Sequence, residues 1–555
     1  MKKSFLVGLA LIFITCVACG QATPEKQIDQ LVSAMLQPAN GGVAIAVAKQ
    51  DKILFSKGYG SANPEYDIAC SPKTIFHVAS VSKQFTAFAI ALLADQGKIS
   101  LDDDIRKYLP ELHDFGHKII IRHLVHHTSG LRDQWNLLAL AGWRLDDVIT
   151  RNQVLRLISH QEELNFKPGD EFSYCNTGYT LMGEIVSRVS GKTFSEWCSE
   201  NIFKPLQMNN TLFYDDHEKI VKGRAYSFQE SPGGLKKSVL SYANAGATSL
   251  FTTAEDLTKW SNNFYTMKVG NAKVMKQMEG RGILNKGDTI SYAFGQDISK
   301  YRGVKTVSHS GGDAGYRSYL LRFPEQKYSI VVLSNLASFN PAKLANNIAD
   351  IYLKGYLKEE PIKKEEKTQA SVSKVSEALL KLYEGQYQLN NEMIVSFKLD
   401  GGKFIAQATG QLPVTLLASS DTEFLIEGMD LKIVFNKESD NTVNQFTLYQ
   451  GGHTIVAPRM KPFDVRSVDL KMFTGTFYSP ELQTSYTLAL SGDTLIANHI
   501  RHEPAKMTAV ANDSFATDAW FMSKIEFTRN EKSEITGFKV SSGRVKNVKF
   551  FKKEL

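Results

Sequence analysis

With 555 residues, the chain is longer than one compact hydrophobic core supports, because single cores stop growing at about 250–300 residues, so we expect two or three domains. Hydrophobic residues (43%) and charged residues (22%) occur at the levels of ordinary globular proteins, which excludes a disordered or collagen-like chain. The formal net charge of +7 is too dilute for the concentrated basic face that binds nucleic acid, so no nucleic-acid partner is expected.

Residues 1–22 have the features of an export signal. Lys2 and Lys3 precede an apolar run at 5–17, which is shorter than the about 20 residues that a membrane-spanning helix needs. Two ways of processing stay open. Val17-Ala18-Cys19 resembles a lipoprotein box in which Cys19 would be lipidated, and Gly20-Gln21-Ala22 would suit an ordinary signal peptidase. We therefore expect an exported protein, periplasmic or anchored as a lipoprotein, that contacts the membrane only through a lipid at Cys19.

Cysteine and histidine usage bears on cofactors. Beyond the export segment the chain has only Cys70, Cys175 and Cys198, which allow at most one disulfide and too few ligands for structural zinc. The histidines of the 123–127 stretch lack the HExxH spacing of a zinc hydrolase. Neither a metal nor an organic cofactor is expected.

The first elements in chain order alternate between strand and helix patterns. Residues 43–48 and 53–55, joined by a polar turn, predict a β-hairpin. Residues 80–96 predict a helix that ends at Gly97, and a second helix is predicted over 177–189. This mixture extends to about residue 357, which predicts one α/β (α+β) domain over 23–357.

The composition changes after this domain. Residues 358–368 are almost all charged or polar, which predicts a solvated linker over 358–376 or, as the alternative, an exposed helix tail. Beyond it, 383–387 and 473–477 begin two matching series of period-2 strands separated by turn residues. We therefore predict two small antiparallel β-barrels, lipocalin-like in size, at 377–463 and 464–555.

The last strand pattern is rich in basic residues. The simplest interpretation places them on a solvated strand face, and a contact with an anionic wall polymer is the alternative. The residues are Arg544, Lys546, Lys549, Lys552 and Lys553.

A serine–lysine pair opens the helix predicted at 80–96. Ser80 lies in the first turn, near unpaired amides and the positive end of the helix dipole. Lys83 follows three residues later on the same face, so a desolvated lysine amine could take the proton of the serine. The pair alone is a weak signal, because 371–374 repeats it within the linker.

Two further motifs give the pair its context. Tyr174-Cys175-Asn176 follows a turn that leads into a helix, and His309-Ser310-Gly311-Gly312 follows a predicted strand at 304–307. The order SxxK, YxN, HxG resembles the serine β-lactamase and penicillin-binding protein superfamily, and its class C-type branch in particular. The resemblance covers about 27–355 and includes further stretches: 74–79, 97–103, 127–131, 243–247 and 253–257.

The resemblance implies a fold and roles for the residues. The fold would be a β-lactamase/transpeptidase-like domain with an antiparallel sheet flanked by helices and a helical subdomain, the site lying between them. Ser80 would be the nucleophile that forms an acyl-enzyme. Lys83 and Tyr174 would share the proton transfers, and which of them is the base stays open. Asn176 would hydrogen-bond the substrate amide or the lysine.

The third motif would complete the site. His309, which stands where many relatives have lysine, would orient Tyr174 or the substrate. Gly311 and Gly312 would border the substrate, and the backbone amides of Ser80 and Gly312 would form the oxyanion hole. Since histidine is neutral for much of the time near pH 7, this position resembles D-aminopeptidases, esterases and some D-Ala-D-Ala peptidases more than dedicated β-lactamases.

The expected function is an exported serine hydrolase that acts through a Ser80 acyl-enzyme on a small amide, peptide or ester, in the manner of D-aminopeptidases and esterases. No GxSxG occurs, which argues against an α/β-hydrolase. The partner would be a small-molecule or short-peptide substrate, and a substrate derived from the cell wall is one of the options. The alternatives are a D-Ala-D-Ala carboxypeptidase, a class C-like β-lactamase, and a non-catalytic protein that binds wall fragments.

Overall fold

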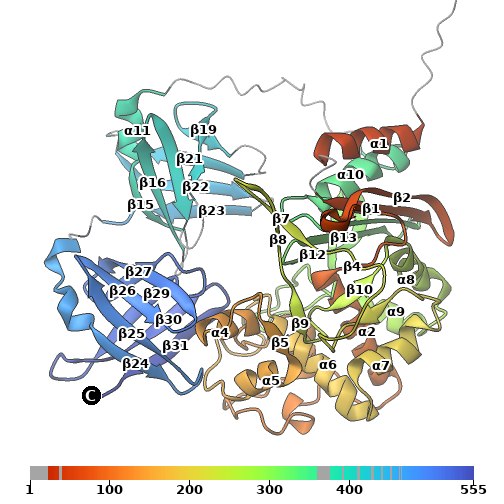
Figure 1. The fold of residues 1–555 in the computed structure, drawn as a ribbon, viewed down its shortest axis with the longest axis horizontal. Coiled ribbons are helices and arrows are strands. Elements are labelled where there is room, and N and C mark those ends of the chain that lie inside the picture. The colour runs from red at the N-terminus through yellow and green to blue at the C-terminus, as the bar shows by residue number, and fades with distance from the viewer. Residues whose placement is uncertain are drawn as a thin grey trace, which may run out of the picture.

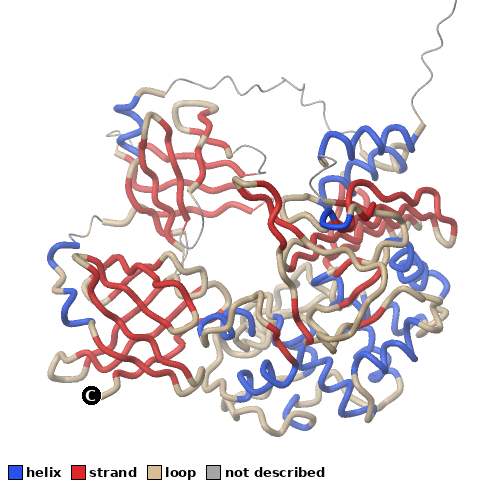
Figure 2. Tube along the Cα trace, in the orientation of Figure 1, coloured by secondary structure: helices blue, strands red, loops and turns tan. Residues whose placement is uncertain are grey.

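The computed structural model describes residues 23–554 except 37–40, 359–374 and short segments at 390–392, 409–412, 427–430, 439, 441, 451–452, 462 and 464. The export signal with Cys19, most of the predicted linker, and the second serine–lysine pair at 371–374 lie outside the described residues. No helix in the described part is both long and apolar enough to cross a membrane. Figure 2 shows the helices gathered in the N-terminal region, while strands dominate the two C-terminal parts.

A seven-stranded antiparallel sheet forms the centre of the N-terminal region. Residues 297–313 supply the strands at one edge of this sheet. The predicted hairpin at 43–55 is confirmed as strands β1 and β2, and β1 joins the sheet by pairing with β14, with Val43 opposite Ser334. The strands lie in the order β11 (Asp297–Tyr301), β12 (Val304–Asp313), β13 (Tyr316–Phe323), β14 (Tyr328–Ser334), β1 (Gly42–Lys49), β2 (Lys52–Asn63) and β3 (Ile68–Ala69).

Strand β1 is buried on both faces because helices cover both sides of the sheet. Alternate side chains of a strand point to opposite faces. Val43 and its i+2 neighbours pack with α1 (Pro24–Met35) and α10 (Pro341–Tyr352), while Ala44 and Ala46 belong to the core on the other face, on which α8 (Ala254–Thr266) packs. Figure 1 shows α1 and α10 side by side on one face of the sheet and α8 on the other.

The helical part of this region is built around α2, whose residues are almost all buried. The two predicted helices are confirmed, with one difference at the first. Helix α2 begins at Ser82, since Ala79–Val81 form a separate 3-10 turn. Helix α6 ends where Gly191 adopts a φ of 71°. The helices are α2 (Ser82–Asp95), α3 (Ile121–Val125), α4 (Gln134–Leu140), α5 (Arg151–Ser159), α6 (Asn176–Ser190), α7 (Phe194–Cys198) and α9 (Ala272–Met278).

Short strands brace these helices. One small sheet pairs β4 with β10 and β6, β5 runs parallel to β9, and β7 pairs with β8. Their bounds are β4 (Phe76–His77), β5 (Val148–Thr150), β6 (Leu212–Phe213), β7 (Phe228–Ser231), β8 (Gly234–Lys237), β9 (Ser241–Ala243) and β10 (Leu250–Thr252).

The first C-terminal unit follows α11 (Glu377–Tyr383) and has the strand order of the predicted barrel. Its strands form two sheets around one aromatic core, and an antiparallel bridge between Tyr387 and Arg459 joins the first strand to the end of the last. One sheet holds β15 (Gly385–Gln388), β16 (Ile394–Asp400), β17 (Lys403–Ala408) and β18 (Val414–Thr415). The other holds β19 (Leu417–Ala418), β20 (Glu423–Leu425), β21 (Leu431–Lys437), β22 (Val443–Gln450) and β23 (His453–Pro458).

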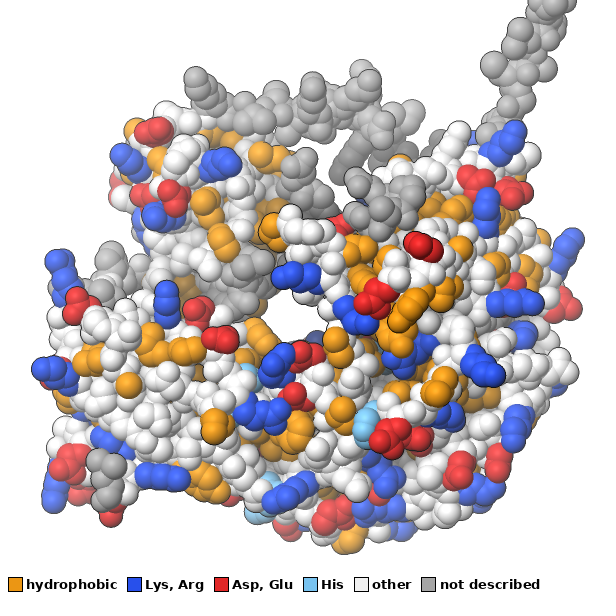
Figure 3. Space-filling model, viewed as in Figure 1, with side chains coloured by type: hydrophobic (Ala, Val, Ile, Leu, Met, Phe, Trp, Pro, Cys, Tyr) orange, Lys and Arg blue, Asp and Glu red, His pale blue; other side chains and the backbone are white. Residues whose placement is uncertain are grey.

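The second repeat is a closed eight-stranded barrel, as the strand pattern predicts. Its strands are β24 (Gly475–Ser479), β25 (Thr484–Ser491), β26 (Thr494–His499), β27 (His502–Ala511), β28 (Ser514–Thr517), β29 (Lys524–Arg529), β30 (Ile535–Ser542) and β31 (Val545–Lys552). We call this element the C-terminal barrel. On the face shown in Figure 3, acidic and basic side chains are interspersed.

The C-terminal barrel packs directly on the helical part of the N-terminal region. Buried Arg132 donates to both carboxylate oxygens of buried Glu481 at 2.6 Å, and to the backbone oxygens of Lys546 and Asn547. The prediction that the basic residues of the last strand form a solvated face is therefore wrong for some of these residues. Lys549 pairs with Glu163 of the N-terminal region, and Arg544 and Lys546 lie at the same interface.

Candidate active site

Ser80 lies in a strained turn that presents it in front of α2. The preceding residue, Ala79, has a φ of 47°, a conformation that costs a residue with a Cβ about 1 kcal/mol or more. Two hydrogen bonds hold the turn: Ser82 Oγ donates to the Ala79 carbonyl at 2.5 Å, and Ser318 Oγ of β13 donates to the Val78 carbonyl at 2.8 Å. Ser80 itself is half-buried.

The Lys83 amine is completely buried and lies 3.1 Å from Ser80 Oγ. It also donates to Asn176 Oδ1 and to the Ala247 carbonyl, both at 2.8 Å. A neutral amine has two N–H donors and one lone pair. Because these two acceptors occupy the donors, the lone pair of neutral Lys83 is left for the Ser80 hydroxyl.

Burial makes the neutral form of the Lys83 amine available near pH 7. Burial lowers the pKa of Lys83 to about 7, against the weaker opposing effect of the Asp313 and Asp133 carboxylates. A substantial fraction of Lys83 is therefore neutral at physiological pH, as a general base requires.

Asp133 fixes Asn176 in place at the start of α6. Its buried Oδ2 accepts from both the backbone N–H of Asn176, at 2.7 Å, and its Nδ2, at 2.8 Å. Since Nδ2 donates to Asp133, the Asn176 Oδ1 must face Lys83. The two residues together orient the lysine.

Tyr174 supplies a second buried proton carrier. Its hydroxyl is buried and makes no hydrogen bond of ordinary geometry within the described residues. Burial raises the pKa of Tyr174, and the neighbouring Ser80 hydroxyl and the Arg544 charge oppose that rise. Lys83 Nζ lies 4.9 Å from the centre of the tyrosine ring.

The imidazole of His127 packs against the Tyr174 ring, with 4.2 Å between ring centres. His127 has a φ of 57°, and its Nδ1 faces the backbone of Cys175. Burial holds the pKa of His127 far below its usual range, so the ring is neutral. The residue positions Tyr174 without carrying charge into the site.

His309 is buried beside Tyr174, but its hydrogen bonds go elsewhere. Nδ1 faces the Ser310 carbonyl at 2.6 Å, so it carries the proton, and Nε2 accepts from the Tyr292 hydroxyl at 2.9 Å. Burial lowers the pKa of His309 to about 3. The expected orientation of Tyr174 by His309 therefore takes the form of ring packing, at 6.2 Å between centres, and not of a hydrogen bond.

Strand β12 brings Gly311 and Gly312 to the nucleophile. A Cβ on Gly311 would lie 2.3 Å from the Val78 oxygen and 3.1 Å from the Ser80 nitrogen, so only glycine lets the strand pass this close. The exposed Gly312 comes next, followed by Asp313, which accepts a hydrogen bond from Thr248. Burial raises the pKa of Asp313 to about 6.

Of these residues, the sequence analysis did not single out Asp133 or Asp313, named Arg544 only among the basic residues of the last strand, and considered His127 only as one of the histidines that lack the spacing of a zinc site. Asp313 directly follows the HxG motif, so its position was a usable signal. Asp133 offered a weaker one as a helix N-cap. Arg544 offered none, because its place depends on the docking of the barrel. Cys175 is buried as a small filler, and all three described cysteines are unpaired.

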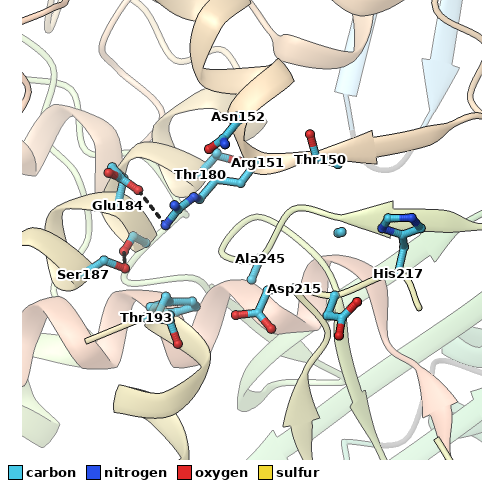
Figure 4. Close-up of a pocket in the computed structure, with 14 residues that line it drawn as sticks. Thr150, Arg151, Asn152, Thr180, Glu184, Ser187, Thr193, Asp215, His217 and Ala245 are labelled. Carbon is cyan, nitrogen blue, oxygen red and sulfur yellow. Dashed lines mark hydrogen bonds and ion pairs between the residues drawn. The ribbon is translucent and has the colours of Figure 1, made fainter. Parts of the chain in front are cut away.

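A separate cavity of about 340 Å³ lies further along α6, where Thr180 and Glu184 face it (Figure 4). Arg151 and Glu184 form an ion pair at 3.3 Å on its wall. Asp215 and His217 lie on the opposite side. None of the residues around Ser80 lines this cavity, so it is distinct from the candidate active site.

The model of the family described as Beta-lactamase matches residues 28–353, more than half of the chain. The chain belongs to the β-lactamase family. The β-lactamase-type fold of the N-terminal region, expected from the motifs, is thereby confirmed, together with its place among the serine hydrolases of that superfamily.

Comparisons with individual proteins agree with this family. The chain is 29% identical to Protein flp of Staphylococcus aureus (strain N315), over 58% of this chain and 66% of that protein, just under two thirds of its length. It is 25% identical to Penicillin-binding protein 4* of Bacillus subtilis (strain 168), over 79% of this chain and 99% of the relative. The octameric penicillin-binding protein homologue from Pyrococcus abyssi has a TM-score of 0.56 at 24% identity, covering 78% of this chain and 99% of its own, and shows the fold alone.

Proposed function

We propose that this β-lactamase family member hydrolyses small amides, peptides or esters through an acyl-enzyme on Ser80. The observation that carries the proposal is the hydrogen bonding of Lys83. Its two fixed acceptors, Asn176 Oδ1 and the Ala247 carbonyl, direct the lone pair of the neutral amine to Ser80 Oγ.

The first half-reaction follows from this arrangement. Ser80 Oγ attacks the acyl carbon while its proton passes to neutral Lys83, and the carbonyl π electrons move onto the oxygen. Backbone N–H groups where Ser80 meets β12 would hold that oxyanion, and one such donor contributes a factor of about 10²–10³ to the rate in other acyl transferases. When the tetrahedral centre collapses, the leaving group takes a proton from Lys83 or, through it, from Tyr174.

In the second half-reaction, water replaces the serine. A water molecule attacks the Ser80 ester, Lys83 or Tyr174 takes its proton, and the proton returns to Ser80 Oγ as the acid departs. Lys83 and Tyr174 end as they began. The expected export of the protein, and its D-aminopeptidase-like or esterase-like preference, belong to the same proposal.

The neutral state of His309 favours this preference over the alternatives. With a pKa lowered to about 3 by burial, His309 offers no positive charge from β12. Many relatives have lysine at this position, a fixed charge suited to a substrate carboxylate. Because β12 lacks that charge here, we place dedicated carboxypeptidase and β-lactamase activity second.

A burst assay tests the proposal. The mature protein is mixed with p-nitrophenyl acetate, and we expect a burst of p-nitrophenol equal to the enzyme concentration, with an acetyl group on the Ser80 peptide by mass spectrometry. Ser80→Ala should lose both signals. Ser187→Ala, in the separate cavity, is the matched control and should keep both. Turnover that survives in Ser80→Ala would overturn the assignment of the nucleophile.

A further inference from the structure

The turn between β30 and β31 of the C-terminal barrel reaches the active site. Its backbone is held there by the N-terminal region: Asp133 N donates to the Arg544 carbonyl at 3.2 Å, Asn165 Nδ2 donates to the same oxygen at 2.9 Å, and Asn136 Nδ2 donates to the Ser542 carbonyl at 3.2 Å. Asp133 is the residue that also fixes Asn176. The turn is therefore attached to the same short segment that orients Lys83.

This turn places the Arg544 guanidinium over the ring of Tyr174, 4.9 Å from the ring centre. Lys83 Nζ lies at the same distance from that ring. The Arg544 side chain is 45% exposed, and its nearest carboxylate oxygen, Asp133 Oδ2 at 3.8 Å, is already saturated by Asn176. The planar fork of donors on Arg544 is therefore largely available to an incoming group.

The other basic side chains against the Tyr174 ring do not supply a fixed positive charge. His127 and His309 are neutral for the reasons given above, and Lys83 is engaged in proton transfer. Arg317, next to Gly312 across the strands, is a further cation, and its Nη1 is held by the carbonyls of Ala314 and Tyr316. Among the described residues against the Tyr174 ring, Arg544 is the permanent cation.

We propose that Arg544, contributed by the C-terminal barrel, determines specificity by binding a carboxylate on the leaving group of the substrate. This inference rests on the proposed function and names the substrate class: amides or esters whose leaving group carries a carboxylate. The leaving group departs where Lys83 and Tyr174 can protonate it, and Arg544 lies against the Tyr174 ring. A guanidinium matches a carboxylate with two parallel N–H···O bonds.

The charge of Arg544 also acts on the proton carriers. It opposes protonation of Lys83 and favours ionisation of Tyr174, both as smaller effects than burial. A bound carboxylate would cancel that charge while the leaving group is in place. Arg544 is thus a substrate-binding residue that belongs to a different domain from the nucleophile.

A pair of acetate esters tests the proposal by steady-state kinetics. Phenyl acetate and 3-acetoxybenzoate transfer the same acetyl group to Ser80 Oγ, and they differ only in the carboxylate on the phenol that leaves. Because a charge-assisted bidentate pair is roughly twice as strong as a neutral hydrogen bond, we expect kcat/KM of the wild type to be at least about tenfold higher for the carboxylated ester. Arg544→Met should lose this advantage, and Arg544→Lys should keep part of it.

Lys546→Met is the matched control, since Lys546 pairs with Glu171 at the rim of the same interface and should retain the full advantage. A thermal unfolding midpoint equal to that of the wild type shows that the barrel of each variant remains docked. If Arg544→Met lowered kcat/KM for both esters equally, or if the wild type did not distinguish them, the carboxylate role would be overturned.

Failure of the proposed function gives a different pattern. Ser80→Ala should abolish turnover of both esters. If Ser80→Ala kept the turnover of both esters while Arg544→Met still removed the carboxylate advantage, the nucleophile would be refuted and the anion site would stand. Absence of turnover of either ester by the wild type would overturn both.

Discussion

Lys83 Nζ and Asn176 Oδ1 lie 2.8 Å apart, and this hydrogen bond decides which direction the lysine lone pair faces. Asn176 cannot rotate its amide, because Asp133 accepts from its Nδ2. The amine is thus constrained from two sides before a substrate arrives. Such preorganisation lowers the cost of aligning a base with its nucleophile.

Replacement of Lys83 by methionine should remove the general base while filling the same volume. We expect kcat/KM for p-nitrophenyl acetate to fall by about 10²–10⁴-fold, the usual contribution of a positioned base. Steady-state kinetics measure the loss, and circular dichroism checks the fold. Lys259→Met, which removes an amine that pairs with Asp256 on α8, is the control and should retain activity. A Lys83→Met enzyme of near wild-type activity would show that Tyr174 acts alone.

The pH profile of acylation should reflect the lowered pKa of Lys83. The neutral amine is the active form and exists above its pKa, so kcat/KM should rise with pH through about 7 and not near the ordinary lysine value of 10.5. Stopped-flow measurement of the burst from pH 5 to 10 tests this. A profile that rises only above pH 9 would contradict the assignment.

Asp313→Asn should move the same profile to lower pH. The Asp313 carboxylate favours the charged form of Lys83, so its neutralisation lowers the pKa of the amine further. Asp102→Asn, at an exposed carboxylate paired with Arg122, is the control and should leave the profile in place. A shift of the Asp313→Asn profile to higher pH would refute this coupling.

Gly311→Ala should damage the oxyanion side of the site. Its added carbon would meet the Val78 oxygen and Ser318 Oγ at 2.3 Å, so β12 must move away from the Ser80 amide. We expect a loss in kcat of about 10²–10³-fold, the effect of losing one oxyanion donor. Gly312→Ala, whose added carbon meets nothing nearer than 3.5 Å, should fold with wild-type stability and shows the effect of a methyl group without displacement. Equal losses in both variants would argue against strand displacement.

Arg132→Met should loosen the C-terminal barrel. It leaves Glu481, 6% exposed, without its ion-pair partner, and breaking a buried pair in this way costs about 3–5 kcal/mol. A lower unfolding temperature and faster proteolysis between the domains would report the change. Arg501→Met breaks the more exposed pair with Asp147 at the same interface and should cost at most about 1 kcal/mol. An unchanged unfolding temperature in Arg132→Met would show that the barrel does not depend on this pair.

The positions of Ser80 just before α2 and of Asn176 at the start of α6 follow from local patterns. Helix stops at Gly97 and Gly191 and the period-2 strands of the sheet are short-range signals, because backbone conformation depends mostly on neighbouring residues. The start of α2 was misplaced by two residues because the bonds that hold the Ala79–Val81 turn come in part from Ser318, on a distant strand. Which strands of the first C-terminal unit meet at its edges could not be predicted, since strand patterns show alternation but not which edges pair.

By itself, the sequence determined the family-type fold, the order of the three motifs and the identity of the residues that meet at Ser80, because each of these depends on residue type and local spacing. Only the tertiary structure decided that Asp133 orients Asn176, that His309 bonds to Tyr292, and that Arg544 faces Tyr174. The contacts that dock the barrel join residues as much as 415 positions apart, as between Arg132 and Asn547. Such contacts arise from the packing of complete domains, whose surfaces match only after each has folded, so no local pattern records them.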